Sequence, residues 1–307
     1  MRRPIMDPSK APCAAVTMVK GDYFFLRRWI AYYAAQFGLQ HLYVLNHGND
    51  PEVRRIAAGA TVIHVPYDES RTKVDSRRWE LISHFTSGLL RYYAWVLCGD
   101  VDEFVVVDPE VAPGLLAYIT SFAEAQTPAV ICPLGIEIIH NPALEPEPLL
   151  EDQPILTRRR IFRLNANYSK PCLIRTPVSY SPGGHSCSHN NRTVDPNLYL
   201  VHLRFVSHDL TLARLQSRVE MKQLESETLS AGAEGVAPAR RATWTRDVES
   251  YLALSKLEPV AETMDFTEFR RVMVEQKKEV RPGSHWFFGG GRSKVLYRLP
   301  ERFTHLI

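Results

Sequence analysis

The stretch Asp100-Val101-Asp102-Glu103-Phe104 places three carboxylates within four residues. In an extended backbone, side chains two residues apart point to the same side, so we expect Asp100 and Asp102 to face one cavity. Two carboxylates in one cavity repel each other unless a cation lies between them, and oxygen ligands of this kind select Mg²⁺ or Mn²⁺. We interpret the pair as a divalent-cation site; the alternative is a solvated acidic turn.

The elements around this stretch predict where it lies in a fold. Trp95–Leu97 reads as a strand that ends just before Asp100. In open α/β sheets, ligands bind beyond the carboxyl ends of the strands. A divalent ion held there typically also bridges a diphosphate. The position of the acidic stretch therefore strengthens its interpretation as a ligand site.

The first half of the chain alternates short apolar runs with helical patterns. We predict strands at 14–18, 42–45, 61–65, 95–97, 105–107 and 129–139, and helices between Asp22 and Gly38 and at 54–58, 74–92 and 111–125. Strands that alternate with helices form βαβ units and a mainly parallel sheet flanked by helices. The fold class expected is therefore α/β and Rossmann-like.

The pattern changes after residue 140. Residues 141–154 are rich in Pro and Glu and predict a loop, and short strands are expected near 155–163, 171–176, 198–205 and 294–299. From about 209 the pattern is mostly helical, with Gly- and Ala-rich linkage at 231–239. We divide the chain into a flexible tail (1–13), an α/β domain (14–230) and a C-terminal helical extension (231–307).

Composition excludes several classes of protein. Of 307 residues, 45% are apolar and 23% charged, which is typical of a globular chain and not of a disordered or coiled-coil one. The net charge of +3 gives no support to a nucleic-acid binder. The five cysteines are scattered without a CxxC pair, and the first residues lack the apolar core of a signal peptide. We expect a cytoplasmic protein with free thiols.

Several short segments carry a family pattern: Met18–Lys20, Trp29–Tyr33, Gly38, Asn46–Asp50, Asp100–Phe104, Ser169–Pro171, Gly183–His185 and His202–Arg204. Between about residues 14 and 220, the chain resembles the bacterial glycosyltransferase family 2-like proteins. The most specific piece is the Asp-Val-Asp-Glu-Phe stretch, which matches the family's DxD motif. One departure is Gly21-Asp22, where the family usually carries Asn-Glu.

The resemblance implies a GT-A-type nucleotide-sugar fold, with the catalytic domain at 14–230. Such a protein moves a sugar from a nucleotide-sugar donor, here expected to be a UDP-sugar, to a hydroxyl of a glycan or lipid-linked acceptor in surface polysaccharide synthesis. Mn²⁺ or Mg²⁺ would be held by Asp100, Asp102 and His202. The residues expected at the nucleotide and diphosphate are Lys20, Asp22, Asp50, Asp100 and Lys170.

Several of these assignments have a structural alternative. Asp50 either contacts the nucleotide or caps the helix that follows it. His202 lies within an alternating strand, where a lone His is usually a hydrogen-bonded core residue. Lys170 and Arg175 are candidate cations for the diphosphate. The basic run at 158–163 is either a solvated face or a contact with an anionic polymer or lipid headgroup at the inner face of the membrane.

Two residues are candidates for the acid–base chemistry of the acceptor. Glu137 closes the 129–139 strand, on the same sheet edge as the acidic stretch; it is either the base or a solvent-facing rim carboxylate. His185 follows two glycines, which suits an active-site loop, and is a second candidate for contact with the metal or the acceptor. Glu103, by alternation, is expected to point away from Asp102.

Two other functions use the same residues. A metal-dependent nucleotidyltransferase or phosphohydrolase would employ the same carboxylates. The Gly-rich loop that nucleotidyltransferases commonly place early in the chain is represented here only by Lys20-Gly21. A non-catalytic nucleotide-sugar-binding protein would bind donor with metal but would not turn it over.

Overall fold

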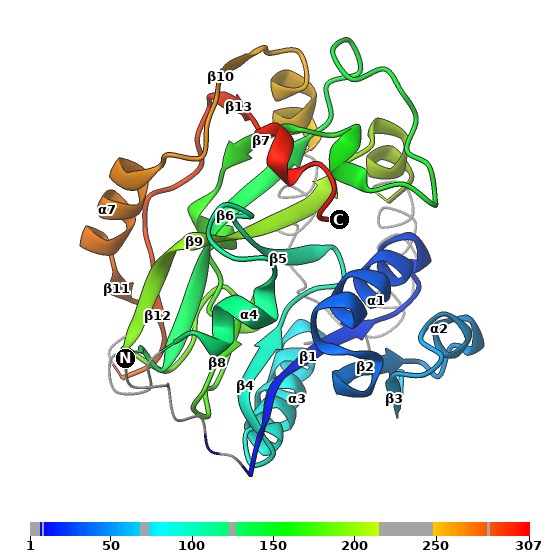
Figure 1. The fold of residues 1–307 in the computed structure, drawn as a ribbon, viewed down its shortest axis with the longest axis vertical. Coiled ribbons are helices and arrows are strands. Elements are labelled where there is room, and N and C mark those ends of the chain that lie inside the picture. The colour runs from blue at the N-terminus through cyan, green and yellow to red at the C-terminus, as the bar shows by residue number, and fades with distance from the viewer. Residues whose placement is uncertain (1–6, 8, 68–73, 123–126, 215–247, 281–282) are drawn as a thin grey trace, which may run out of the picture.

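A computed structural model describes residues 7, 9–67, 74–122, 127–214, 248–280 and 283–307 (Figure 1). One eleven-stranded sheet forms the centre of these residues, and helices cover it. The α/β class with a large sheet flanked by helices is therefore confirmed, and it is compatible with a Rossmann-like fold.

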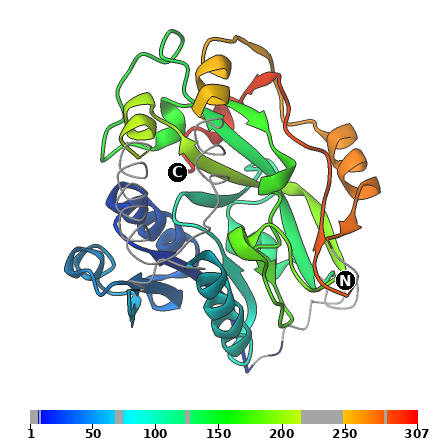
Figure 2. The ribbon, with the colours of Figure 1, turned by 180° about the vertical axis from the view of Figure 1, so that it is seen from behind.

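The first half of the sheet is parallel, as the alternating pattern predicts. It consists of β1 (Ala11–Val19), β2 (Leu42–His47), β3 (Thr61–Val65) and β4 (Tyr93–Cys98), and β1 pairs with both β2 and β4. The helices that connect these strands are α1 (Tyr23–Phe37), α2 (Pro51–Ile56) and α3 (Val74–Leu89). Helices α1 and α3 cover opposite faces of this half, as Figures 1 and 2 show together. Right-handed crossovers in opposite directions along the sheet require that arrangement.

Beyond β4 the sheet becomes mixed. The central strand β6 (Val130–Ile139) is buried along its whole length and pairs antiparallel with β7 (Ile161–Leu164) and β8 (Leu173–Ile174). Strand β8 is also antiparallel to β4 and so joins the two halves. The expectation of a mainly parallel sheet holds for β1–β4 and for single pairs beyond them, whereas the pairs that β7 and β8 make are antiparallel. Strands of two to four residues are too short for the sequence to predict their partners.

Strand β9 (Arg192–Phe205) lies between two earlier strands. It pairs in parallel with β6 and antiparallel with β5 (Glu103–Val107). The other edge of β5 contacts α1: the Val105 N–H donates to the hydroxyl of Tyr33 at 2.9 Å, and the hydroxyl of Tyr32 donates to the Val105 carbonyl at 2.8 Å. Aromatic residues of α1 thus fix the strand that directly follows the acidic stretch.

The C-terminal part mixes short elements. Residues 248–254 are helical, and they are followed by β10 (Pro259–Glu262), α7 (Thr267–Glu275), β11 (Lys278–Glu279), β12 (Trp286–Phe287) and β13 (Leu296–Arg298). Strands β10 and β13 extend the sheet through β7. The expected helices are present at 248–254 and in α7, and the strand expected at 294–299 is present as β13, whereas β10, β11 and β12 are too short to show readable alternation in the sequence. The Gly- and Ala-rich linkage at 231–239 lies outside the described residues.

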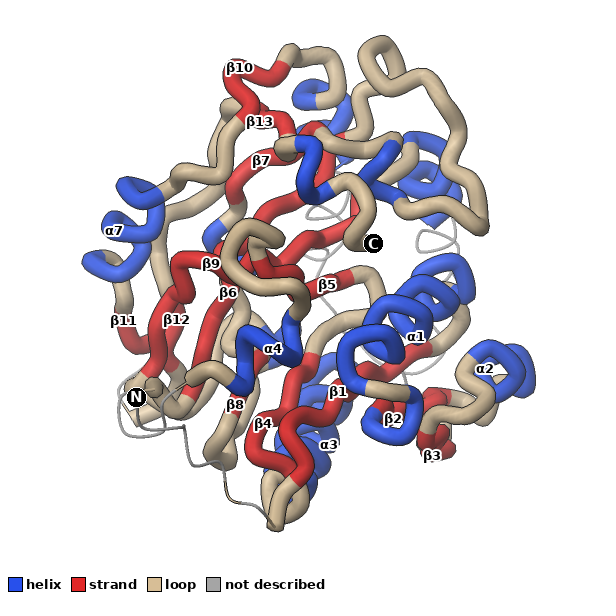
Figure 3. The backbone as a smooth tube through the Cα atoms, viewed as in Figure 1, coloured by secondary structure: helices blue, strands red, loops and turns tan. Residues whose placement is uncertain are grey.

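Smaller elements complete the part of the chain that the structure describes. They are α4 (Leu115–Thr120), shorter than the helix predicted at 111–125, and five 3₁₀ turns: η1 (Leu39–His41), η2 (Ile155–Thr157), η3 (Ala166–Tyr168), η4 (Pro182–Gly184) and η5 (Glu301–Phe303). Residues 141–154 form the expected loop, coloured as such in Figure 3. The strand predicted at 155–163 is wrong in its first half, where η2 stands instead.

Two further sequence expectations concern thiols and membranes. All five cysteines are buried and unpaired. Within the described ranges, no helix is long and apolar enough to cross a membrane.

Candidate active site

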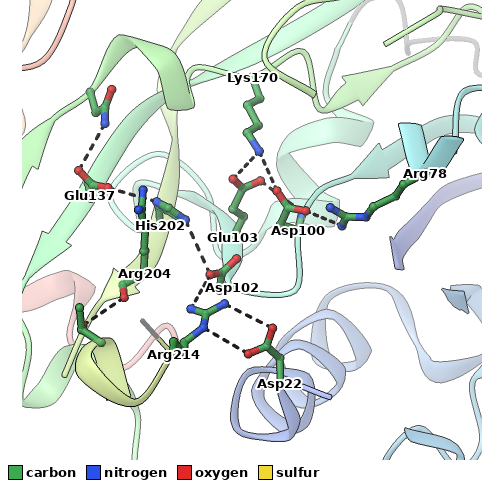
Figure 4. A network of polar contacts seen from close by, with 12 residues as sticks. Asp22, Arg78, Asp100, Asp102, Glu103, Glu137, Lys170, His202, Arg204 and Arg214 are labelled. Atoms are coloured by element: carbon green, nitrogen blue, oxygen red, sulfur yellow. Dashed lines mark hydrogen bonds and ion pairs between the residues drawn. The ribbon is translucent and has the colours of Figure 1, made fainter. Parts of the chain in front are cut away.

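The acidic stretch lies where the sequence places it, between the end of β4 and the start of β5, at the carboxyl ends of the parallel strands (Figure 4). Its backbone is not extended, however. Val101 and Asp102 form a turn, which the Glu103 N–H closes by donating to the Asp100 carbonyl at 3.0 Å. The Asp102 carbonyl accepts from the Leu203 N–H of β9 at 2.9 Å. Because of the turn, the alternation rule fails here and the two aspartates have different partners.

Asp100 is held by two cations. Lys170 Nζ lies 2.9 Å from its Oδ2, and an Arg78 Nη2 lies 2.5 Å from its Oδ1. Burial alone would raise the pKa of Asp100, but the Lys170 and Arg78 charges outweigh it and hold that pKa far below its ordinary value. Asp100 is therefore ionised at neutral pH and already neutralised by the chain's own side chains.

Lys170 also binds Glu103. Its Nζ lies 2.6 Å from Glu103 Oε1, and both side chains are almost completely buried. Alternation predicts that Glu103 points away from Asp102, and the structure places its carboxylate on Lys170. The other oxygen of Glu103 accepts from the Asp100 N–H at 3.2 Å. Lys170 thus ties together both ends of the acidic stretch.

Asp102 has a different pair of neighbours. Arg214 Nη1 lies 3.0 Å from its Oδ2, and His202 Nε2 lies 3.8 Å from the same oxygen. Arg214 also reaches Asp22, with Nε 3.3 Å from Oδ1 and Nη2 3.3 Å from Oδ2. One guanidinium therefore bridges a carboxylate after β1 and a carboxylate after β4. Burial raises the pKa of Asp102, but the charges of Arg214 and His202 lower it below its ordinary value.

Glu137 and His202 face each other across the β6–β9 pair, where they are in register. Glu137 Oε1 lies 3.5 Å from His202 Nδ1, and its Oε2 accepts from Arg163 Nε at 2.6 Å and from Asn165 Nδ2 at 3.3 Å. Glu137 is 1% exposed, so the alternative of a solvent-facing rim carboxylate is wrong. Burial raises the pKa of Glu137, but His202 and Arg163 outweigh it and lower that pKa to about 2.

His202 is buried between Glu137 and Asp102, as Figure 4 shows. Its ring centroid lies 3.9 Å from that of Tyr168. The imidazole is therefore packed like a core residue and at the same time aimed at Asp102. The core interpretation of His202 is confirmed, and its role as a metal ligand stays a prediction.

His185 also lies next to the Tyr168 ring, with centroids 5.9 Å apart. It is exposed, and its Nδ1 is 2.7 Å from the Asn167 carbonyl oxygen. The preceding Gly184 has a φ of +67°, and a Cβ there would lie 2.3 Å from the Trp79 ring. Only glycine allows this loop to pack so closely on α3.

The residues expected at the nucleotide follow β1 and β2. Lys20 is exposed, and its Nζ lies 3.1 Å from the ring centroid of Tyr67. Asp50 caps α2 by accepting from the Glu52 N–H at 2.9 Å, and its second oxygen accepts from the Tyr23 hydroxyl at 2.7 Å. The capping role of Asp50 is thus confirmed, and its role at the nucleotide stays a prediction. Asp22 adopts the left-handed conformation, with a φ of 53°.

The basic run at 158–163 is neither a solvated face nor an open surface for anions. Arg158 and Arg160 pair with the glutamates Glu147, Glu262 and Glu301. Arg159 is buried and donates to backbone carbonyls, including that of Val206 at 2.9 Å. Arg163 is the buried partner of Glu137. Arg175, the other candidate for the diphosphate, lies 5.6 Å from the Trp95 ring centroid.

Gly135 determines where Lys170 lies. A Cβ at Gly135 would stand 2.4 Å from the Asn165 carbonyl oxygen and 2.7 Å from the Ser169 nitrogen. The Gly135 N–H donates to Ser169 Oγ at 2.8 Å, and the Asn165 N–H donates to the Gly135 carbonyl at 2.9 Å. The segment before Lys170 therefore lies directly on the backbone of β6.

A divalent ion requires a set of donors. Within the described ranges, no group of three or more His, Cys, Asp or Glu side chains is arranged around a common metal position. Asp102 Oδ2 and His202 Nε2 are 3.8 Å apart, which lets two ligands share one ion at about 2.1–2.3 Å each. A carboxylate oxygen and an imidazole nitrogen suit Mn²⁺. The donors fit as two protein ligands of a shell that a diphosphate and water would complete.

Sequence reasoning missed Arg78 and Arg214 and underrated Arg163. Each is an arginine distant in sequence from its carboxylate, and an arginine on a helix or in a basic run carries no local sign of its partner. No protein-family model matches this chain, and no curated protein matches it.

Proposed function

We propose that this protein is a metal-dependent glycosyltransferase that moves a sugar from a nucleotide-sugar donor to an acceptor hydroxyl. The observation that carries the proposal is the pair Asp100 and Asp102, two ionised carboxylates at the carboxyl ends of parallel strands, next to Lys170, Arg78 and Arg214. The resemblance of this stretch to the family's DxD motif adds the expectation of a GT-A-type fold.

The proposed reaction releases a nucleoside diphosphate, whose developing negative charge has to be neutralised. Mn²⁺ or Mg²⁺, when bound, supplies a Lewis acid at the diphosphate. Asp102 and His202 would hold the ion, and Asp100 would join them or keep its partners Lys170 and Arg78. Lys170 and the arginines contribute further positive charge that is fixed before the donor arrives.

The strand ends after β1 and β2 suit the nucleotide. Lys20, Asp22 and Asp50 follow these strands, at the edge of the sheet where open α/β folds bind ligands. A UDP-sugar is the donor we expect. The acceptor in the proposal is a glycan or a lipid-linked glycan of surface polysaccharide synthesis, in the cytoplasm or at the inner face of the membrane. The donor and the acceptor derive from the resemblance, and the location is the expectation that the sequence gives by itself.

Of His185 and Glu137, His185 is the better candidate for the base that takes the proton from the acceptor hydroxyl. It is exposed, so an acceptor can reach it, and its position beside Tyr168 places it one ring away from His202. Partial burial of its ring and the Lys170 charge lower the pKa of His185 to about 4, which still lies above that of Glu137. Glu137 is buried, bound to Arg163 and has a pKa of about 2, so at neutral pH it is a weak proton acceptor. We propose that Glu137 orients His202 instead, as a carboxylate behind an imidazole ligand does.

A donor panel tests the proposal. Each UDP-, GDP-, ADP- or TDP-sugar is incubated with the protein and Mn²⁺ or EDTA, and release of the nucleoside diphosphate is measured. Metal-dependent release from one donor, with sugar transferred to an added acceptor, is the expected result. If the nucleoside diphosphate is released but no acceptor receives the sugar, the result indicates a phosphohydrolase. Binding without any release indicates a non-catalytic nucleotide-sugar-binding protein.

A further inference from the structure

We propose that Arg214 is an exchangeable counter-ion of the metal site: it holds Asp102 and Asp22 while no divalent cation is bound, yields Asp102 to the ion, and then binds the diphosphate of the donor. This inference rests on the proposed function and adds to it a residue and an order of events that the acidic motif alone does not contain.

Arg214 occupies the carboxylate oxygen that a shared ion would need. Arg214 Nη1 lies 3.0 Å from Asp102 Oδ2, which is also the oxygen nearest to His202 Nε2. An ion shared by Asp102 and His202 would bind this same oxygen. A guanidinium and a divalent cation next to one carboxylate oxygen repel each other, so the ion weakens the contact between Arg214 and Asp102. Binding of the ion therefore favours release of Asp102 by Arg214.

Lys170, Arg78 and Arg214 differ in how tightly they are held by their carboxylates. Lys170 is 3% exposed and bound to two carboxylates at 2.9 and 2.6 Å. Arg78 is bound to Asp100 at 2.5 Å and donates to the Met18 carbonyl at 3.2 Å. The Arg214 side chain is 18% exposed, similar to that of Arg78 at 21%, but its contacts with Asp102 and Asp22 are longer, at 3.0 to 3.3 Å. By the length of its contacts, Arg214 is thus the most loosely held of these three cations.

The guanidinium of Arg214, once released from Asp102, can bind the diphosphate of the donor. Arg214 keeps Asp22 and the ring of Phe25, whose centroid lies 4.9 Å from its Cζ, as anchors at the start of α1. A guanidinium released from one carboxylate has a planar pair of donors free, and this geometry matches phosphate oxygens. A nucleoside diphosphate on the metal would place such oxygens beside Asp102. The exchange therefore converts a carboxylate-bound arginine into a diphosphate-bound one.

The test compares Arg214→Gln with wild type and with Arg302→Gln. Arg302 binds Asp108 through two nitrogens at 2.8 Å each, outside the acidic cluster, and controls for the loss of a paired arginine. Free Mn²⁺ is titrated by electron paramagnetic resonance without nucleotide. UDP is then titrated by calorimetry at saturating Mn²⁺. Circular dichroism and thermal melts check that each variant is folded.

The exchange predicts opposite effects in the two titrations. Arg214→Gln should bind Mn²⁺ at least about tenfold more tightly than wild type, because the competing cation is gone. It should bind UDP in the presence of Mn²⁺ at least about tenfold more weakly, because a charge-assisted contact is lost. Arg302→Gln should change neither affinity by more than about twofold. Arg214→Lys, which cannot bridge both carboxylates with a fork, should shift Mn²⁺ affinity in the same direction by less.

The proposal is overturned if Arg214→Gln leaves Mn²⁺ affinity unchanged or weakens it, or if neither wild type nor the variant binds Mn²⁺. It is also overturned if wild type binds UDP equally well in EDTA, since Arg214 would then replace the ion permanently. Should Arg214→Gln fail to fold, the result for Arg214→Lys decides. The donor panel reports on the function separately, because Mn²⁺ affinity can change in a protein that cleaves no donor.

Discussion

The two aspartates of the acidic stretch differ more than their spacing suggests. Asp100 is bound to Lys170 and Arg78, and Lys170 is held in turn by Glu103 and by a loop that lies on Gly135. Asp102 faces His202 and a partly exposed Arg214. We call these surroundings the Asp100 side and the Asp102 side. On the Asp100 side, Lys170 and Glu103 form a core ion pair to which the 25% exposed Asp100 is attached, whereas the Asp102 side offers ligands whose partner can change.

The largest effect we expect is on the Asp100 side. Lys170→Met leaves the buried Glu103 without its cation, while Asp100 keeps Arg78, and breaking a buried ion pair in this way costs about 3–5 kcal/mol of unfolding free energy. Urea denaturation measures the loss. Arg271→Met on α7 is the control, because its partners Glu268 and Glu275 are exposed and such pairs contribute about 0–1 kcal/mol. If Lys170→Met loses no more unfolding free energy than the control, the Asp100 side does not contain a stabilising core ion pair and does not differ from the Asp102 side in this respect.

On the Asp102 side we expect an effect on turnover. Asp102→Asn should lower donor cleavage by at least about a hundredfold, because one group that stabilises charge is removed. Arg214 keeps Asp22 as its partner, so the free energy of unfolding should change by no more than about 1 kcal/mol. Asp100 and Asp102 each have their own cation, so relief of the repulsion between them should add little to the unfolding free energy of Asp102→Asn.

Asp108→Asn is the matched control for that variant. Asp108 is also a buried aspartate bound to an arginine, Arg302, but outside the acidic cluster. Initial rates with the best donor and thermal melts are measured for both variants. Near-normal activity in Asp102→Asn, or activity lost only because the variant unfolds, would contradict a ligand role for Asp102.

The third prediction concerns pH and the carboxylate behind His202. The pKa of Glu137 falls from an ordinary 4.5 to about 2 in the folded protein. A lowered pKa contributes stability that is present above pH 4.5 and is lost as pH falls toward the folded pKa. The contribution at neutral pH is on the order of 3 kcal/mol.

Urea unfolding of wild type and Glu137→Gln between pH 2 and pH 7 checks this. The difference in unfolding free energy should be largest above about pH 5 and should shrink as the pH falls to 2. A difference that stays constant over the whole range would mean that Arg163 and His202 do not stabilise the charged form of Glu137.

The smallest effects are expected at Asp50, which belongs to neither side. Asp50→Ala should lose about 1 kcal/mol of unfolding free energy, since α2 loses its cap, whereas Asp50→Ser keeps a capping oxygen and should lose less than about 0.5 kcal/mol. If Asp50 also contacts the nucleotide, both variants should bind UDP more weakly in calorimetry. Normal UDP affinity in Asp50→Ser would leave Asp50 with the capping role alone.

The sequence predicts the part of the molecule in which neighbours along the chain are neighbours in space. Strands β1 to β4, the helices between them and the place of the acidic stretch all follow from local patterns of apolar residues. The cap at Asp50 is predicted for the same reason, because its partner Glu52 is two residues away. These features depend on short-range geometry that a single sequence displays.

What could not be predicted depends on distant contacts. Arg214 lies 112 residues from Asp102, and Lys170 lies 70 residues from Asp100. The turn at Val101 and Asp102 defeats the alternation rule, because the chain has to redirect from β4 to β5 at that point. Glu137 reads as a rim residue at a strand end, yet β7 and β9 cover it from both sides.

The position of β9 also has a consequence for the order in which the protein can form. Strand β9 is the last of three to be synthesised, yet it lies between β5 and β6 and pairs with both. Until residues 192–205 have left the ribosome, β5 and the β9-facing edge of β6 lack this common partner, and unpaired strand edges attract other chains. Contacts of such long sequence separation also slow folding. A nascent chain that stops before residue 192 therefore lacks both His202 and the strand that joins β5 to β6. Such a chain depends on protection of those strand edges to stay in solution.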